Sequence, residues 1–481
     1  MSKSHNNTSR RAFIRNTALT TVGISIIPRH VLGQGFIPPS DQLNIAIIGG
    51  GGKGHSDAIN AWNKGASNIA AICDVDWNQA SSLFDKFPNA KKYKDFRKVL
   101  DEIKDLDAIT VSTPDHTHAV IAMAAMKMGK HVYVQKPLTH NIHEARMMTQ
   151  AANKYGVVTQ MGNQGASGNG VKQMIKWFDQ GLIGTVKEVH VWTNRPVWPQ
   201  GIAAPTDKPT IIEGLDWDTW IGPAQMVDYH PLYHPFKWRG WWNFGTGALG
   251  DMGCHLIDPP FRVLGLGYPT EVESSVGSVF KRDWVPEYFP ESCPVSSRTQ
   301  LKFPASDKNP TEMTMTWTDG GLRPFHPDLI PADHPLGDED SSNGVIMIGE
   351  KGIMTCGTYA RNPKIYLNNG DILKEEQSDF VDNNLPENGH QASWVEACKQ
   401  GFGTEKHKAL TSSFDFAGPL TEAILMGNLA IRSYNLREKR GNGFDYPGRK
   451  KLLWDGANMK IANFEPANQF VKREYREGWS L

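Results

Sequence analysis

The chain has 481 residues, which is too long for one ordinary core and predicts roughly two or three domains. Hydrophobic residues make up 39% of the sequence and aromatic residues 10%, a composition typical of soluble globular proteins. Since 51 basic residues balance 51 acidic ones, no excess of charge indicates nucleic acid or an anionic membrane as a partner.

The amino-terminal stretch SRRAFIR places Arg10 and Arg11 ahead of a short apolar run over residues 18–27. It resembles a twin-arginine export signal, which implies the twin-arginine export machinery as a partner and a periplasmic location. We expect residues 1–33 to form this signal, with cleavage after Gly33 or retention as a membrane tether. A basic tail without structure is the alternative.

From Leu43 to Leu138, short apolar runs alternate with segments of helical period, which predicts parallel βαβ units. The expected strands are NIAIIGG, NIAAICDVD, LDAITVSTP and KHVYVQKP, and the expected helices include HSDAINAWNKG and HTHAVIAMAAMKMG. We therefore predict an α/β fold that begins with a doubly wound parallel Rossmann sheet over residues 42–165.

A glycine-rich turn stands between the first of these strands and the first helix. Gly49, Gly51 and Gly54 form G-x-G-x-x-G, and Asp74 ends the second strand twenty residues later. This context predicts a dinucleotide site in which the helix N-terminus faces the pyrophosphate and Asp74 holds the adenosine ribose. Because Asp74 and Asp76 would repel a 2′-phosphate, the sequence favours NAD over NADP.

Beyond Val186 the pattern changes to longer alternating stretches such as TVKEVHVWTN, SSRTQLKFP and TEMTMTWTDG. These predict a second, α+β domain over residues 166–440 with a large, mostly antiparallel open sheet. Two late helices, QASWVEACKQG and PLTEAILMGNLAIRSY, are expected to pack back on the body, as is a C-terminal extension over residues 441–481.

Two motifs in the first domain carry a family resemblance. TPDHTH (113–118) and QKPLTHN (135–141) resemble the paired signatures of the Gfo/Idh/MocA oxidoreductases. That family joins a Rossmann domain to a C-terminal α/β domain whose open sheet often makes the oligomer, which implies a homodimer or homotetramer. The resemblance implies cofactor contacts by Thr113, Asp115, His118, Gln135, Lys136 and Asn163, with Lys136 between nicotinamide and substrate.

The second of these motifs departs from the family at one position. The family usually has Glu-Lys-Pro where this chain has Gln135, Lys136 and Pro137. Because glutamine removes a negative charge beside the lysine, we expect it to lower the pKa of Lys136 and to make the neutral amine more accessible as a base.

A further motif, FGTGALGDMGCHLID, places Asp251 and His255 four residues apart on one face of a helix. It is similar to the family's D-x-x-x-H, in which the histidine meets the oxidised hydroxyl and the aspartate orients or assists it. Lys136 and His255 are then the two candidates for the group that takes the hydroxyl proton. A hydrogen-bonded pair with a purely structural role is the alternative.

Seven of the fifteen tryptophans lie between Trp192 and Trp242, among amide and charged side chains. Flat aromatic faces beside polar groups are what a carbohydrate pocket requires, although many of these rings are expected to pack the core. Arg195 and Trp198 are the preferred substrate contacts. We predict no metal site, because the prolines of HPLYHP break the helix that His230 and His234 would need.

The five cysteines have neither a CxxC pair nor the spacing of a zinc site, so we expect small buried side chains and no disulfide framework. They are Cys73, Cys254, Cys293, Cys356 and Cys398.

An exported dehydrogenase cannot exchange NAD with a soluble pool, so we expect the cofactor to be loaded before export, held tightly and regenerated in each cycle. One hypothesis is an oxidoreductase that acts on a secondary sugar hydroxyl, at C3. A second is a redox-neutral glycosidase, which oxidises, eliminates, hydrates and reduces, with a base from Tyr229, His230 or Tyr233. A third, distant one is a sugar-binding protein without catalysis.

Overall fold

The computed structural model describes residues 42–374 and 389–481. The segment interpreted as an export signal, residues 1–33, lies outside the described residues. Within the described residues no helix combines the length and the apolar character needed to cross a bilayer.

Six parallel strands form the first sheet, in the order β3-β2-β1-β4-β5-β6, which confirms the predicted Rossmann sheet. Alternate side chains of β1 enter different clusters, because Ile45 and Ile47 point to one face and Ala46 and Ile48 to the other. Both faces are therefore buried, which explains the near-continuous apolar runs. The strands are β1 (Leu43–Ile48), β2 (Ser67–Cys73), β3 (Lys91–Tyr93), β4 (Ala108–Val111), β5 (His131–Val134) and β6 (Thr159–Met161).

Helices cover both faces of this sheet. Asn141 caps the longest of the first five helices at its start, and Gly156 ends it in the left-handed conformation. A helix from much later in the chain adds Trp394 to the cluster around Ile45, where its ring lies 5.6 Å from that of Tyr133. The helices are α3 (Lys53–Trp62), α4 (Trp77–Lys86), α5 (Phe96–Glu102), α6 (His118–Lys127), α7 (Ile142–Tyr155) and the late α12 (Gly389–Gln400), which is followed by α13 (Glu405–Lys408).

The second sheet has ten strands, in the order β16-β15-β14-β13-β7-β12-β11-β8-β19-β20. Among its described pairs β7 and β12 run parallel and the others antiparallel, which confirms the predicted architecture. The strands are β7 (Val186–Trp192), β8 (Glu271–Val276), β11 (Ser297–Phe303), β12 (Met313–Thr318), β13 (Gly344–Gly349), β14 (Gly352–Cys356), β15 (Lys364–Leu367), β16 (Ile372–Lys374), β19 (Leu452–Asp455) and β20 (Lys460–Ile461).

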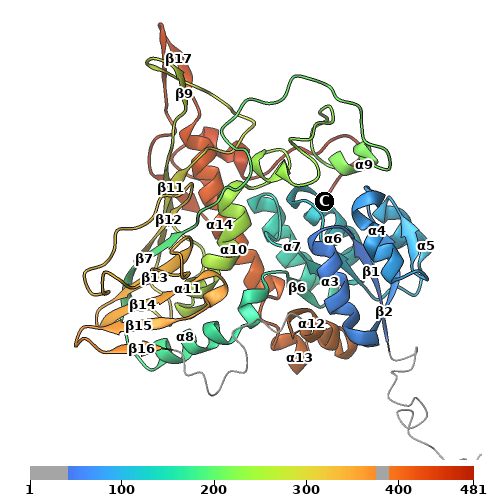
Figure 1. Ribbon diagram of the computed structural model, residues 1–481, viewed down its shortest axis with the longest axis horizontal. Helices are drawn as coiled ribbons and strands as arrows, with labels where there is room; N and C mark the ends of the chain where they lie inside the picture. The colour runs from blue at the N-terminus through green and yellow to red at the C-terminus, as the bar shows by residue number, and fades with distance from the viewer. Residues whose placement is uncertain (1–41, 375–388) are drawn as a thin grey trace, which may run out of the picture. The chain divides into compact units, whose positions relative to one another are not determined.

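Helices α10 and α14 lie between the two sheets (Figure 1). Glu422 of α14 is fully buried and forms a bidentate ion pair with Arg146 of α7, at 2.7 and 2.9 Å. The remaining elements are α8 (Asn169–Asp179), α9 (Trp217–Ile221), α10 (Gly247–Leu256), α11 (Asp258–Val263), α14 (Phe414–Tyr434) and two hairpins, β9 (Phe280–Arg282) with β10 (Val285–Pro286) and β17 (Glu438–Arg440) with β18 (Gly443–Asp445). All five cysteines are buried and unpaired.

Candidate active site

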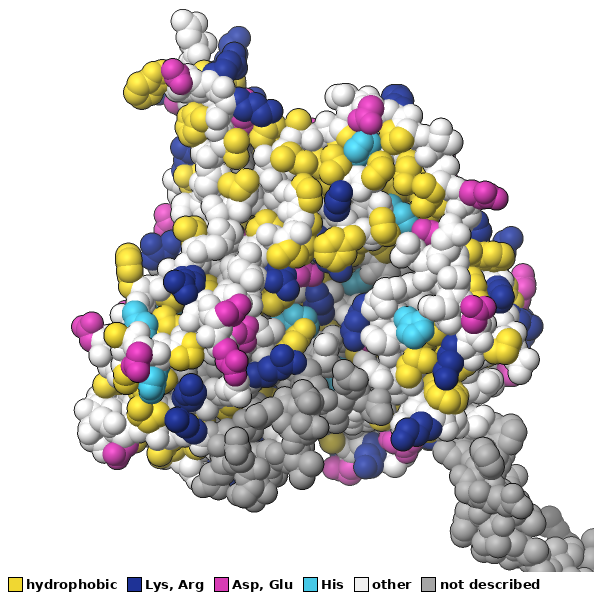
Figure 2. All heavy atoms as spheres, in the orientation of Figure 1, with side chains coloured by type: hydrophobic (Ala, Val, Ile, Leu, Met, Phe, Trp, Pro, Cys, Tyr) yellow, Lys and Arg dark blue, Asp and Glu magenta, His cyan; other side chains and the backbone are white. Residues whose placement is uncertain are grey.

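The carboxyl ends of β1, β2, β4 and β5 open into a cavity of about 480 Å³. The strand order reverses between β1 and β4, which is where ligands bind in sheets of this order. The opposite wall comes from the stretch between β7 and α10 and from α10 itself. Figure 2 shows this face hollowed near its middle, with Lys, Arg and His side chains in the hollow.

The glycine-rich loop forms one end of the cavity. Gly49 has a φ of +86°, a conformation that favours glycine, and a Cβ at Gly54 would overlap the carbonyl oxygen of Gly49. Gly49, Gly51 and Gly52 line the cavity in front of the N-terminus of α3. Backbone that only glycine permits therefore faces the cavity where a pyrophosphate would lie, and these residues fit a dinucleotide.

Asp74 lines the same end of the cavity. Its Oδ2 accepts the N–H groups of Gly50 at 2.8 Å and Gly51 at 3.0 Å, and its Oδ1 accepts that of Asp76 at 2.9 Å. Burial raises the pKa of Asp74, while these three donors act in the opposite direction. The carboxylate is thus fixed beside the loop, where the sequence predicts the ribose contact.

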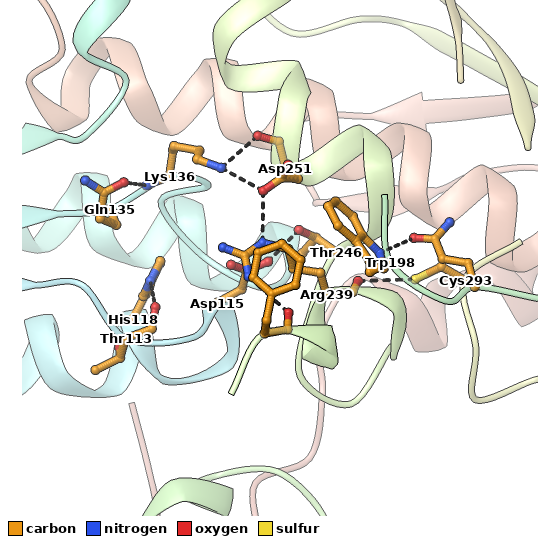
Figure 3. A network of polar contacts seen from close by, with 12 residues as sticks. Thr113, Asp115, His118, Gln135, Lys136, Trp198, Arg239, Thr246, Asp251 and Cys293 are labelled. Carbon is orange, nitrogen blue, oxygen red and sulfur yellow. Dashed lines mark hydrogen bonds and ion pairs between the residues drawn. The ribbon is translucent and has the colours of Figure 1, made fainter. Parts of the chain in front are cut away.

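At the other end, Lys136 and Asp251 form the centre of a polar network (Figure 3). The Nζ of Lys136 donates to Oδ1 of Asp251 at 2.8 Å and to its carbonyl oxygen at 2.9 Å, and the Nε of Arg239 donates to the same Oδ1 at 3.2 Å. Burial opposes ionisation of Asp251, but Lys136 and Arg239 outweigh it and hold the pKa of this carboxyl well below its usual range. Lys136 therefore keeps an anionic partner although residue 135 is a glutamine.

His255 comes one turn after Asp251 on α10 and also lines the cavity. Its ring meets that of Tyr359 edge to face at 4.6 Å, and its Nδ1 is buried without a hydrogen-bond partner among the described residues. Burial, assisted by the charge of Lys136, lowers the pKa of His255 well below its ordinary value. The imidazole is neutral at neutral pH and can accept a proton.

Asp115 lines the cavity near Lys136 and Asp251 and is buried. The hydroxyl of Thr246 donates to Oδ2 of Asp115 at 2.6 Å. Burial raises the pKa of Asp115 to about 7, against the opposing charges of Arg239 and Lys136. This carboxyl therefore changes its charge near neutral pH.

Gln135 is held by a residue that the motifs did not indicate. The Nε2 of Gln135 donates to Oδ2 of the fully buried Asp57 at 2.7 Å, and Ser112 donates to the same oxygen at 2.9 Å. The other oxygen of Asp57 accepts from Gln391 at 2.9 Å and lies 3.2 Å from the Nζ of Lys53. Asp57 lies on the same buried face of α3 as two alanines and a glycine. An acidic residue on such a face is the feature of the sequence that could have indicated this contact.

Ten of the residues predicted from the sequence line the cavity together. They are Gly49, Gly51, Asp74, Thr113, Asp115, Gln135, Lys136, Arg195, Asp251 and His255.

The other predicted residues do not line it in the described part of the chain. His118 is buried, with its ring nitrogens 2.8 Å from the carbonyl oxygens of Thr113 and Pro137, so it ties the two motifs together. Asn163 donates to Oδ1 of Asp258 at 3.2 Å, and Gly54 serves the close contact described above. These three are placed to support the cavity walls.

The predicted substrate contacts fall into two groups. Arg195 lines the cavity, whereas the buried Trp198 donates its Nε1 to Oε1 of Gln200 at 2.9 Å behind the wall. Tyr229 and Tyr233 belong to a buried aromatic cluster, and burial raises the pKa of Tyr233 to about 12. His230 lies 3.2 Å from a carboxylate oxygen of Asp207. The rings of Tyr229 and Tyr233 are buried among other apolar side chains, which explains why they pack together rather than face the cavity.

Several cavity residues were not singled out by the sequence motifs. Arg239 lies 4.3 Å from the ring of Trp238, and the Nε2 of His234 donates to Oδ2 of Asp76 at 2.7 Å. The aromatic residues among them are Trp220, Phe236, Trp238, Tyr359 and Trp479. The described residues contain no cluster of His, Cys, Asp and Glu that could hold a metal ion.

Comparison with known families identifies the domains that carry this site. An oxidoreductase family model for an NAD-binding Rossmann fold matches residues 43–163, and the model of the same family's C-terminal α/β domain matches residues 167–279. Over these residues the chain matches the Gfo/Idh/MocA oxidoreductase family. The predicted resemblance is therefore confirmed for both domains.

Two curated dehydrogenases resemble part of the chain. Levoglucosan dehydrogenase from Pseudarthrobacter phenanthrenivorans is 26% identical over 255 residues, 51% of this chain and 55% of that protein. D-glucoside 3-dehydrogenase from Escherichia coli is 25% identical over 229 residues, 47% of this chain and 55% of that protein. The chain thus matches about half the length of these relatives.

Solved structures of a dehydrogenase and of an oxidoreductase share the fold of this chain. Levoglucosan dehydrogenase in complex with NADH and levoglucosan has a TM-score of 0.55 at 16% identity, covering 81% of this chain and 98% of that one. Aldose-aldose oxidoreductase from Caulobacter crescentus has a TM-score of 0.53 at 17% identity, covering 80% and 97%.

Proposed function

We propose that this protein is an NAD-dependent oxidoreductase that oxidises a secondary hydroxyl of a sugar or glycoside, at C3. The observation that carries the proposal is the placement of Lys136, Asp251 and His255 in the cavity that begins at the glycine-rich loop. The similarity to a levoglucosan dehydrogenase and to a D-glucoside 3-dehydrogenase supports the substrate class and the position.

The chain's own groups supply the proton chemistry. NAD, when bound, accepts the hydride from the carbon that carries the hydroxyl. His255 lines the cavity and is neutral, so it takes the hydroxyl proton. Lys136 is oriented by Asp251 and stabilises the negative charge that develops on the substrate oxygen.

The walls of the cavity suit a carbohydrate. Phe236 and Trp238 offer aromatic surface, and Arg195 and Arg239 offer donors for hydroxyl groups. Asp74 favours NAD over NADP, because a 2′-phosphate would meet its carboxylate.

We also propose that NAD is retained through the catalytic cycle and that the chain is exported with NAD already bound. The support is the twin-arginine resemblance of the stretch at Arg10 and Arg11, together with the scarcity of soluble NAD outside the cytoplasm. A homodimer or homotetramer is proposed from the family resemblance.

The redox-neutral glycosidase is the weaker candidate. It needs an additional base near C2, and the three residues expected to supply it, Tyr229, His230 and Tyr233, do not line the cavity of the described chain. The dehydrogenase requires only groups that do line it.

A direct test starts from protein purified without added nucleotide and exposed to a panel of glycosides. We expect a stoichiometric rise in the near-ultraviolet absorbance of reduced nicotinamide and a keto-sugar by mass spectrometry. Lys136→Met and His255→Asn should each slow this step by about 100-fold or more while NAD stays bound. Aglycone released over many turnovers without net reduction would support the glycosidase instead.

A further inference from the structure

The wall of the cavity includes a tryptophan from the last part of the described chain. Trp479 lines the cavity together with Asp74, Lys94 and Phe96 of the Rossmann domain and Trp220 of α9. Its side chain is half-buried and packs against the hydrophobic core. A segment with little secondary structure therefore reaches a site that is otherwise built by the two sheet domains.

Trp479 lies at the adenosine end of this cavity. Asp74 and Phe96 follow β2 and β3, whereas Lys136 follows β5 at the opposite end. In this strand order the acid after β2 holds the adenosine ribose, so the residues around it enclose the adenosine half of a dinucleotide. The ring centroids of Trp479 and Phe96 are 6.2 Å apart with an interplanar angle of 38°.

Charged and aromatic neighbours hold the indole ring of Trp479 in place. The guanidinium of Arg97 lies 4.8 Å from the ring centroid, a cation–π contact. The backbone N–H of Trp479 donates to the carbonyl oxygen of Arg476 at 3.1 Å, which closes a turn that fixes the position of the residue. The ring is therefore positioned before any ligand binds, which lowers the entropy lost on binding.

Two anchors fasten the segment that carries Trp479. Arg473 and Tyr475 both donate to Oε1 of Glu144 at 2.9 Å, and Glu144 is a fully buried residue of α7. Arg476 pairs with Asp218 of α9 and donates its Nε to the carbonyl oxygen of Gly222 at 3.0 Å. Figure 1 shows the C-terminal end of the chain near α9 and α6. The segment is thus tied both to α7, which follows β5, and to α9.

We infer that Trp479 is an adenine-binding residue and that the anchored segment 473–479 limits the release of the dinucleotide. Trp479 and Phe96 offer aromatic surface to a purine, and stacking of a base on an aromatic side chain is commonly worth about 1–3 kcal/mol. The inference rests on the proposed use of NAD, and it supplies a structural reason for NAD retention.

The test compares the full-length wild type with Trp479→Ala and Trp479→Phe, using radiolabelled NAD, ADP-ribose and nicotinamide mononucleotide. For Trp479→Ala we expect NAD and ADP-ribose to bind about 10- to 100-fold more weakly and NAD to dissociate faster, while nicotinamide mononucleotide binds as in the wild type. Trp479→Phe should recover most of the affinity, because it keeps an aromatic face.

A second variant tests the anchor without changing the cavity wall. Arg476 does not line the cavity in the described residues, and Arg476→Ala should speed NAD release in the same direction as Trp479→Ala. Trp284→Ala is the matched control, because that tryptophan is 94% exposed on the β9–β10 hairpin. It should leave all three affinities unchanged, and thermal melts of each variant establish that it is folded.

The outcomes separate this inference from the proposed function. If the wild type binds NAD and Trp479→Ala binds it with the same affinity, only the role of Trp479 is overturned. An equal loss for nicotinamide mononucleotide would also overturn it, since the effect would then be general damage to the site. A wild type that binds neither NAD nor ADP-ribose would overturn the proposed function together with this inference.

Discussion

A single buried carboxylate links the residues around Lys136. Asp57 accepts hydrogen bonds from Gln135, Ser112 and Gln391, three segments that meet behind the cavity wall. Because Gln135 donates to it at 2.7 Å, residue 135 has to be a donor as long as residue 57 is an aspartate. The glutamine is thus explained by its partner.

The contact between Gln135 and Asp57 is tested by moving the negative charge from residue 57 to residue 135. Gln135→Glu should lower the free energy of unfolding by roughly 3 kcal/mol, because it places two buried carboxylates in contact. Asp57→Asn in the same chain restores a donor and an acceptor and should recover at least about half of that loss. Urea unfolding of both single variants and the double variant measures the coupling, and an additive double variant would contradict it.

In the proposed reaction, His255 has to be neutral to take the hydroxyl proton. Burial lowers its pKa, so the neutral form persists as the pH falls through about 6.5, the ordinary value. We expect single-turnover reduction of bound NAD to show no inflection near that pH.

Asp115 has a pKa of about 7 and would add an inflection of its own, so the profile is measured in Asp115→Asn as well as in the wild type. A loss of rate centred near pH 6.5 in both proteins would show that His255 titrates normally and would contradict the assignment.

At the scale of elements, the turn from β1 into α3 requires close contact between the glycine-rich loop and the start of the helix. A Cβ at Gly54 would overlap the carbonyl oxygen of Gly49, which is backbone and cannot rotate away. The helix N-terminus and the loop therefore keep their spacing only with glycine at this position.

Gly54→Ala should weaken NAD binding by about 10-fold or more and should lower the free energy of unfolding by roughly 1–3 kcal/mol. Gly267→Ala is the control, because a Cβ there meets no described atom within 4 Å and its φ is not in the left-handed region. Isothermal titration with NAD and urea unfolding measure the two effects. Equal behaviour of the two variants would show that the loop tolerates displacement.

At the scale of the whole molecule, the two sheet domains are joined through α7 and α14. The ion pair between Arg146 and Glu422 crosses this contact, and Glu422 is fully buried. The cavity lies between the two domains, so its width depends on contacts such as this one.

Arg146→Ala leaves the Glu422 carboxylate buried without its partner and should lower the free energy of unfolding by roughly 3–5 kcal/mol. Lys408→Ala removes an exposed pair with Glu405 and should cost less than about 1 kcal/mol. The midpoints of urea unfolding measure both changes. A small effect of Arg146→Ala would mean that water or another cation replaces the guanidinium.

The local features of the site follow from short stretches of sequence. Gly49, Gly51 and Gly54 in front of a helix, and Asp251 and His255 one turn apart, were predictable because turn geometry and helical period depend on nearby residues. The two domains and their sheets were predictable for the same reason, from period and chain order.

Which side chains share the cavity was decided by the tertiary structure. Tyr229 and Tyr233 lie in an aromatic cluster, whereas Arg239, Tyr359 and Trp479 line the site. No local pattern distinguishes these two groups, because each position depends on packing between segments that lie far apart in the chain. The sequence by itself determined the chemistry that is present, and the packing of distant segments determined where each group points.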